Sequence, residues 1–167
     1  MRIVSGRAIS IRAAAFLLTL IAALGLTFGR YIYVERQPLF AGAAWMGQAV
    51  RMRMLYRLGV DANAPGCEYR SCFYPIWGAA YGGHDDEILF LLAHGADVNA
   101  KRKIGSGTTA LMVAAYNGHE STVRLLLSKG ADANVVSDGI TALTLARDKH
   151  HPEIVELLLQ AGARDTP

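Results

Sequence analysis

The sequence predicts an all-α solenoid of about four helix-turn-helix units with projecting hairpin loops, preceded by an N-terminal transmembrane helix. The solenoid is predicted by a glycine-centred phrase that recurs along the chain, and by a second glycine that recurs twelve residues before it. The transmembrane helix is predicted by residues 13–29, AAAFLLTLIAALGLTFG, which carry no charge. We therefore expect a basic segment at 1–12, a signal anchor at 13–34 and a repeat domain at 35–167.

The apolar run at 13–29 would be about 25 Å long as a helix, the short end of a membrane span. Arginines flank it on both sides, with three before it and two after it: Arg2, Arg7, Arg12, Arg30 and Arg36. The excess before the span favours an N-terminus inside the cell and a repeat domain outside. A cleaved signal peptide and a buried core helix stay open as alternatives, although small residues suited to cleavage are missing directly after the apolar core.

Net charge divides the chain near residue 36. The first 36 residues hold five Arg and one Glu, a net charge of +4, whereas the remaining 12 basic and 13 acidic residues give −1. The basic balance therefore belongs to the membrane end. Because the repeats show no stripe of like charge beyond Lys101, Arg102 and Lys103, we expect no nucleic-acid partner.

Two cysteines, Cys67 and Cys72, lie five residues apart in CEYRSC, among turn-forming residues. So short a loop can bring their Cα atoms within the roughly 5.5 Å that a disulfide needs, and closing it contributes about 2 kcal/mol. Disulfides persist in oxidising compartments such as the bacterial periplasm. Two unrelated thiols, or a redox pair, stay open as alternatives, although the spacing is not CxxC.

The recurring phrase ends each predicted unit. Its glycines are Gly59, Gly95, Gly130 and Gly162, at intervals of 36, 35 and 32 residues. Gly47, Gly83 and Gly118 occupy the earlier position, where the fourth unit has His150. We expect a short helix that ends at the earlier residue, a second helix that ends at the later one, and then an extended, turn-rich stretch. The units span approximately 38–64, 72–100, 107–135 and 138–167.

Several of these motifs resemble the ankyrin-repeat family: GADVNA at 95–100, GH at 83–84 and 118–119, and DGITAL at 138–143. The resemblance covers about residues 38–167. It implies paired antiparallel helices, hairpin-like loops on one side, and a curved stack. The Thr-Pro-Leu-His motif that opens repeats in the family appears here without its His, which is replaced by Trp77, Met112 and Thr144. We expect apolar packing of Trp77 and Met112 to substitute for the hydrogen bonds of that His.

Within the resemblance, partner contacts come from the two residues before each first-helix glycine and from the hairpin tips. The first set is Trp45, Met46, Tyr81, Gly82, Tyr116, Asn117, Asp148 and Lys149. The second set is Tyr69, Arg70, Lys101, Arg102, Lys103, Ser106, Thr108, Asp138 and Ile140. Tyr81 and Tyr116 at equivalent positions predict an aromatic ladder on the concave face. The alternative is ordinary solvated surface, with each ring packed on its own repeat.

We expect no catalytic residue, no metal site and no cofactor. Structural roles explain the histidines: His84 and His119 fill the GH position, His94 lies in a polar turn, and His150 and His151 lack further ligands nearby. Ser121 beside His119 and Glu120 marks a helix start, where such residues cap the helix. Three acids, Asp85, Asp86 and Glu87, suit a helix dipole better than acid–base catalysis.

The predicted function is a non-catalytic protein–protein interaction module, a scaffold or an inhibitor, that takes another protein and no small-molecule substrate. A single span at 13–34 is expected to tether it to a bacterial inner membrane, with the repeats in the periplasm. Two other functions stay open. One is a periplasmic thiol-disulfide redox module that uses Cys67 and Cys72, and the other is an adaptor that faces the cytosol.

Overall fold

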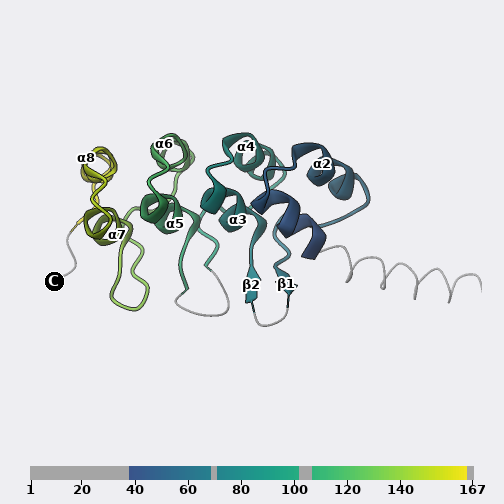
Figure 1. Ribbon diagram of the computed structural model, residues 1–167, viewed down its shortest axis with the longest axis horizontal. Helices are drawn as coiled ribbons and strands as arrows, with labels where there is room; N and C mark the ends of the chain where they lie inside the picture. Colours follow the sequence, from purple (N-terminus) through teal and green to yellow (C-terminus); the bar gives the residue numbers. More distant parts are fainter. Residues whose placement is uncertain (1–37, 69–70, 102–106, 165–167) are drawn as a thin grey trace, which may run out of the picture. The chain divides into compact units, whose positions relative to one another are not determined.

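A computed structural model describes residues 38–68, 71–101 and 107–164. In this part of the chain, helices lie in two rows (Figure 1). The first row holds a helical segment at 38–45 and then α3 (Pro75–Gly82), α5 (Ala110–Asn117) and α7 (Ala142–Asp148). The second row holds α2 (Ala49–Arg57), α4 (Asp85–Ala93), α6 (Glu120–Ser128) and α8 (Pro152–Gln160). Each first-row helix pairs with the second-row helix that follows it, so the predicted stack of helical pairs is present.

Local sequence explains where these helices begin and end. Thr109 and Thr141 cap α5 and α7, and their side chains accept hydrogen bonds from the backbone amides of the third helical residue. Pro75 opens α3, where a missing N–H does no harm. Gly83 and Gly118 end α3 and α5 with φ of 70° and 78°, a left-handed conformation that side chains oppose.

The core runs the length of the stack, between the two rows. First-row helices are buried almost all round: Ala79 and Ala80 in α3, and Ala114 and Ala115 in α5, have no exposed surface. Small side chains at these positions let α3, α5 and α7 approach one another closely. Second-row helices bury one side only, through residues such as Ile88 in α4 and the equivalent Val123 in α6.

Asparagines join each unit to the next one. The Nδ2 of Asn63 donates to the Gly95 carbonyl at 2.6 Å, and its Oδ1 accepts from the Asp97 amide at 2.8 Å. Asn99 and Asn134 make the same two bonds with the units that follow them. Because the recurring phrase places Asn at the same point each time, the hydrogen bonds repeat with the period of the sequence.

Hairpin-like loops project below the first row in Figure 1. Strands β1 (Gly66–Glu68) and β2 (Ser71–Phe73) pair antiparallel, and the register places Cys67 opposite Cys72. A tighter turn joins Ser137 to Ile140 through two backbone hydrogen bonds of 2.9 Å. The expected projecting hairpins are therefore present, and β1 and β2 are the only strands named in the described part of an otherwise helical fold.

One helix start differs from the prediction. The N-cap of α6 is His119, and no side chain caps this helix, because Ser121 lies inside its first turn. The His that recurs at this position of the repeat fixes the start instead, because its ring packs on Gly83 of the preceding unit. The first unit is a helical pair like the others, with Phe40 and Met52 fully buried in the shared core.

Candidate protein-binding surface

The candidate surface is formed by the first-row helices and the loops beneath them. The residue two positions before each first-helix end lies at the same place in every unit, and these residues are Trp45, Tyr81, Tyr116 and Asp148. Trp45, Tyr81 and Tyr116 are 39%, 40% and 42% exposed. Rings of this size are usually buried more deeply, so their repeated exposure marks one surface. We call Trp45, Trp77, Tyr81, Tyr116 and Ile140 the aromatic face.

Three rings of the aromatic face contact one another. The Trp45 ring lies 5.1 Å from that of Tyr81, and the Trp77 ring stacks on Tyr81 at 5.7 Å, measured between ring centroids. Trp77 is nearly buried, and its indole N–H donates to the Thr108 hydroxyl at 3.1 Å, which ties α3 to the loop before α5. Trp77 thus takes over from the missing His both by packing, as predicted, and by a hydrogen bond.

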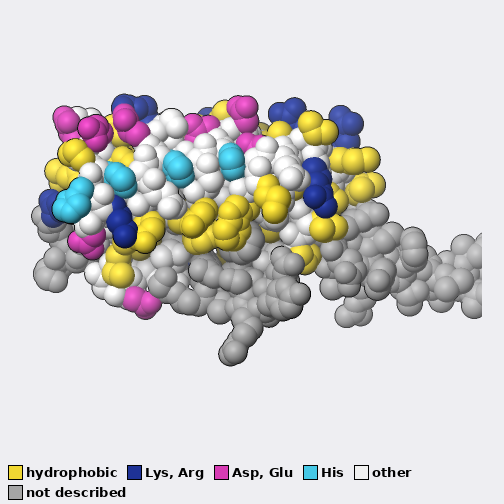
Figure 2. All heavy atoms as spheres, in the orientation of Figure 1, with side chains coloured by type: hydrophobic (Ala, Val, Ile, Leu, Met, Phe, Trp, Pro, Cys, Tyr) yellow, Lys and Arg dark blue, Asp and Glu magenta, His cyan; other side chains and the backbone are white. Residues whose placement is uncertain are grey.

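A hollow of about 290 Å³ lies between Tyr81 and Tyr116. Its lining is mostly apolar and comes from α3, α5, α7 and the projecting loops: Trp77, Tyr81, Thr108, Met112, Val113, Tyr116, Ser137, Ile140 and Leu145. In Figure 2 a band of hydrophobic side chains follows the first row beneath a row of His side chains. The hollow therefore belongs to an apolar surface that continues across several units.

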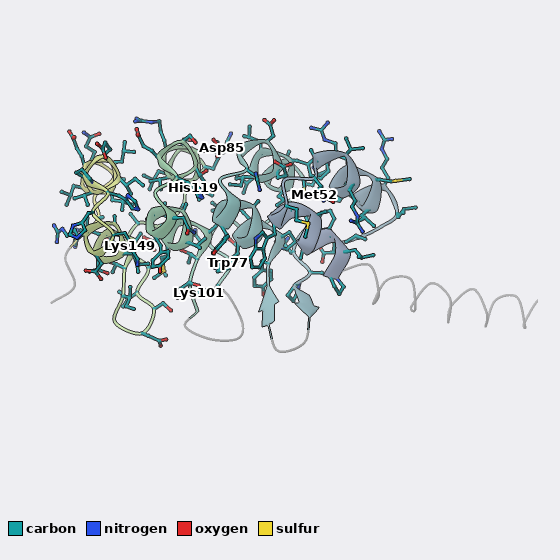
Figure 3. All side chains as sticks on the ribbon, in the orientation of Figure 1. Met52, Trp77, Asp85, Lys101, His119 and Lys149 are labelled. Carbon is teal, nitrogen blue, oxygen red and sulfur yellow. The ribbon has the colours of Figure 1, made fainter. Side chains whose placement is uncertain are left out.

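Tyr116 has a charged neighbour instead of a ring. The Lys149 ammonium lies 4.4 Å above the Tyr116 ring centroid, a cation–π contact between α5 and the end of α7. Lys149 and Trp77 both lie on the first-row side in Figure 3. Among the described residues, the Tyr81 ring contacts the rings of Trp45 and Trp77, and the hollow separates it from Tyr116. The predicted aromatic ladder therefore does not run directly from Tyr81 to Tyr116.

Histidines of the GH motif hold this surface in place. The Nε2 of His84 lies 3.0 Å from the Trp45 carbonyl oxygen, and the Nε2 of His119 lies 2.9 Å from that of Tyr81. Each ring also packs on a glycine of the preceding unit, since a Cβ at Gly83 would lie 2.8 Å from the His119 ring. Trp45 and Tyr81 are therefore each fixed through their own backbone by the next unit.

Residues 76–166, more than half of the chain, match a family model described as ankyrin repeats in three copies. The chain belongs to the ankyrin-repeat family. It is also similar to the 2-5A-dependent ribonuclease of Mus musculus, with 35% identity over 81 residues. That match covers 48% of this chain and 10% of the ribonuclease, so the chain spans about a tenth of the length of that relative. Ankyrin repeats indicate a protein–protein interaction module.

The structure places the remaining predicted contact residues of this ankyrin chain in different environments. Met46, Lys101, Asp138, Asp148 and Lys149 are exposed. Asn117 is half-buried and donates to the Val113 carbonyl at 3.0 Å, and Gly82 lies against the His84 ring, so both serve the fold. Five others lie outside the described residues: Tyr69, Arg70, Arg102, Lys103 and Ser106.

Some features of the surface were not predicted. The sequence placed Trp77 in the core and did not identify Met112, Val113 and Leu145 as lining residues of a hollow. Their apolar character is visible in the sequence, but the hollow that they line forms between helices and loops of different units. Only the relative placement of loop and helix reveals this space.

The histidines and acids of this ankyrin domain serve its packing. His94 lies with Nδ1 2.6 Å from the Phe90 carbonyl, and a Cβ at Gly118 would lie 2.7 Å from the His151 ring. Asp85 accepts a 2.6 Å hydrogen bond from the hydroxyl of buried Thr122, which joins α4 to α6. Within 38–68, 71–101 and 107–164, no three His, Cys, Asp or Glu side chains are grouped as metal ligands would be.

Two further predictions concern the membrane anchor and the disulfide. The predicted anchor at 13–34 lies outside the described residues, and no helix among those described is both long and apolar enough to cross a bilayer. For the predicted disulfide, the strand register sets the Cα atoms of Cys67 and Cys72 directly opposite each other. Both predictions remain proposals.

Proposed function

We propose that this chain is a non-catalytic adaptor, a scaffold or an inhibitor, that binds another protein through the aromatic face and the loop tips. The observation that carries the proposal is an apolar hollow lined by the exposed rings of Tyr81 and Tyr116, with the exposed Trp45 ring against Tyr81. Interface hot spots are enriched in Trp, Tyr and Arg, and they bind in water-excluding pockets. A partner that inserts an apolar side chain into the hollow would bury these rings.

Preorganisation makes such a surface effective. Tyr81 is held on both sides, by ring contacts with Trp45 and Trp77 and by His119 at its carbonyl. Binding therefore orders few side chains, and each side chain that is already fixed saves about 0.5–1.5 kcal/mol of entropy. Exposed charged residues of the projecting loops, such as Lys101 and Asp138, would add charge contacts that select among partners.

We further propose that residues 13–34 tether the repeats to a bacterial inner membrane, with the repeats in the periplasm. The uncharged run at 13–29 and its flanking arginines support the tether. Tethering raises the effective concentration of the adaptor near membrane partners. Alkaline phosphatase fused after Pro167 should be active in this topology, whereas an inactive but well-expressed fusion would favour the cytosol-facing adaptor.

A pull-down of the full chain from solubilised membranes tests the binding surface. Tyr81→Ala and Tyr116→Ala should each weaken recovery of the partner, because truncating a hot-spot side chain costs about 2 kcal/mol, or about 30-fold in affinity. Leu89→Ala is the matched control, since Leu89 is 42% exposed but lies on α4 in the second row. Equal recovery with all three variants would show that the aromatic face is not the binding surface.

The redox alternative makes a different prediction for the cysteines. If Cys67 and Cys72 form a structural disulfide, replacing both with Ser should lower stability by up to about 2 kcal/mol and leave partner recovery unchanged. A redox module would lose its activity in the same double variant, and its disulfide would be readily reduced by added dithiol. Thiol titration before and after mild reduction separates the two cases.

A further inference from the structure

The outer side of α2 in the first unit exposes an unusual set of residues. Val50, Met54 and Leu58 are 82%, 67% and 51% exposed, and they recur every four residues. At 100° per residue they form one stripe, with Arg51 on one side of it and Arg53 and Arg57 on the other. We call these six residues the cap face. Figure 2 shows hydrophobic and basic side chains together at the α2 end.

The cap face differs from the equivalent surfaces of the other second-row helices. Counting back from the helix-ending glycine, the position of Val50 holds Asp86, Ser121 and Glu153 in the later units. The position of Leu58 holds His94, Lys129 and Ala161. All of these positions are exposed, so burial by a neighbouring repeat does not explain the apolar side chains of Val50 and Leu58. The position of Met54 is apolar in every unit, and its equivalents Phe90, Leu125 and Leu157 are half-buried.

Charge separates α2 from its counterparts as well. The first turn of α4 carries three acids and that of α8 carries one, as the helix dipole favours, whereas α2 has no acid in its first turn and three arginines along its length. Arg53 reaches towards α4, with its guanidinium carbon 5.8 Å from the Phe90 ring centroid. The arginines thus surround an apolar stripe at the end of the stack, where terminal repeats normally have a polar outer face.

We propose that the cap face lies on the anionic surface of a phospholipid bilayer. The apolar stripe then lies at the boundary between headgroups and acyl chains, and the arginines lie at the lipid phosphates. An apolar stripe between basic side chains is the pattern of helices that lie in the membrane interface. Each Arg near an anionic surface strengthens binding about fivefold, so three give about a hundredfold. A second copy of the chain fits less well, because its own arginines would face these three.

Chain length brings the cap face to the bilayer. The proposal rests on the tether of the proposed function, whose span ends at residue 34, four residues before the helical segment at 38–45. Four residues reach at most about 14 Å, which spans a headgroup layer of about 5–8 Å and keeps the first unit within reach of the membrane surface. The basic segment at 1–12 is positively charged and is not complementary to the arginines. The proposal holds for either side of the membrane.

An environment-sensitive fluorophore tests the contact in the full chain. The label is attached at Val50→Cys, in a background with Cys67→Ser and Cys72→Ser, and the chain is incorporated singly into lipid nanodiscs. Ser121→Cys is the matched control, because Ser121 is the exposed equivalent of Val50 in α6. In discs that contain phosphatidylglycerol, emission at position 50 should shift to shorter wavelength and be quenched by brominated acyl chains, and emission at position 121 should not change.

Three comparisons decide the origin of the shift. Arg51→Gln, Arg53→Gln and Arg57→Gln together should abolish it, and so should about 1 M salt, where charges are screened within about 3 Å. A shift of equal size in discs of phosphatidylcholine alone would overturn the proposal, because the apolar run at 13–29 or neutral lipid would then cover the stripe. A shift that needs two chains per disc would assign the cap face to a second copy.

The same experiment separates this inference from the tether. If the chain does not enter discs of either composition, the tether itself fails, and the inference fails with it. If the chain enters the discs and positions 50 and 121 give the same emission, the tether stands and the lipid contact is wrong. Circular dichroism of the Gln variants checks that the exposed replacements leave the helices intact.

Discussion

At the scale of single residues, His150 stands where the other units have glycine. Gly47, Gly83 and Gly118 have φ of 64°, 70° and 78°, and His150 takes the same left-handed conformation with φ of 58°. A side chain in this region approaches the next carbonyl oxygen, which costs about 1–2 kcal/mol. The fourth unit keeps the geometry of the repeat in spite of this strain, because His151 must still reach Gly118.

His150→Gly should therefore stabilise the protein. We expect the free energy of unfolding to rise by about 0.5–1 kcal/mol, since relief of strain exceeds the added freedom of glycine in the unfolded chain. This corresponds to a rise in Tm of roughly 1–4 °C for a chain of this size. Thermal unfolding followed by circular dichroism measures it. Lys149→Gly is the control, because Lys149 has φ of −93° and gains nothing from glycine. A fall in Tm with both variants would contradict the account.

Sequence reasoning at this scale identified the position of His150 but not its conformation. Comparison of the four units places His150 where the other three have Gly. The residues alone are equally compatible with a first helix that ends at a different residue in the fourth unit. Trp77 is similar: its packing role followed from its place in the motif, whereas its hydrogen bond to Thr108 depends on how the preceding loop folds back. Side-chain partners far apart in the chain need the assembled structure.

At the scale of elements, the GH motif couples each helical pair to the next. His119 starts α6, packs its ring on Gly83 and bonds the Tyr81 carbonyl at 2.9 Å. The same residue thus sets a helix start, a contact between units and the placement of an aromatic side chain. Gly83 is required twice, for its left-handed φ of 70° and for the space that the ring fills.

Replacing glycines of one unit separates these two requirements. Gly95→Ala should cost about 1 kcal/mol, because Gly95 has φ of 83° but nothing lies within 4 Å of an added Cβ. Gly83→Ala should cost about 1–3 kcal/mol more, since its Cβ would lie 2.8 Å from the His119 ring and force that ring to move. Urea unfolding measures both. Equal losses of stability would show that the ring contact contributes nothing.

The elements themselves were largely predictable, because each follows from local signals that the chain repeats. Thr109 and Thr141 as caps, glycines as helix ends and the Asp138–Gly139 turn all act within a few residues. The prediction for Ser121 failed where a local rule competed with the stack. A Ser near a helix start suggested a side-chain cap, but the helix begins after His119, whose ring packs on Gly83 and which lies two residues before Ser121.

At the scale of the whole repeat domain, the two proposed contacts use different surfaces. The aromatic face follows the first row and the loops, whereas the cap face belongs to α2 at the end of the second row. A domain held at its α2 end would leave Tyr81 and Tyr116 open to a partner. The resemblance to ankyrin repeats implied that Tyr81 and Tyr116 lie on the contact surface, but the hollow between them depends on the spacing of three units and could not be derived from one.

Site-specific photo-crosslinking tests the central claim, that the first-row side is the surface which contacts a partner protein. A photoreactive amino acid is placed at position 81 or 116 of the full chain in native membranes, with positions 89 and 159 as exposed controls on α4 and α8. We predict that positions 81 and 116 yield the same crosslinked partner and that the controls yield none. Crosslinks to one partner from positions 89 and 159, with none from 81 and 116, would contradict the account.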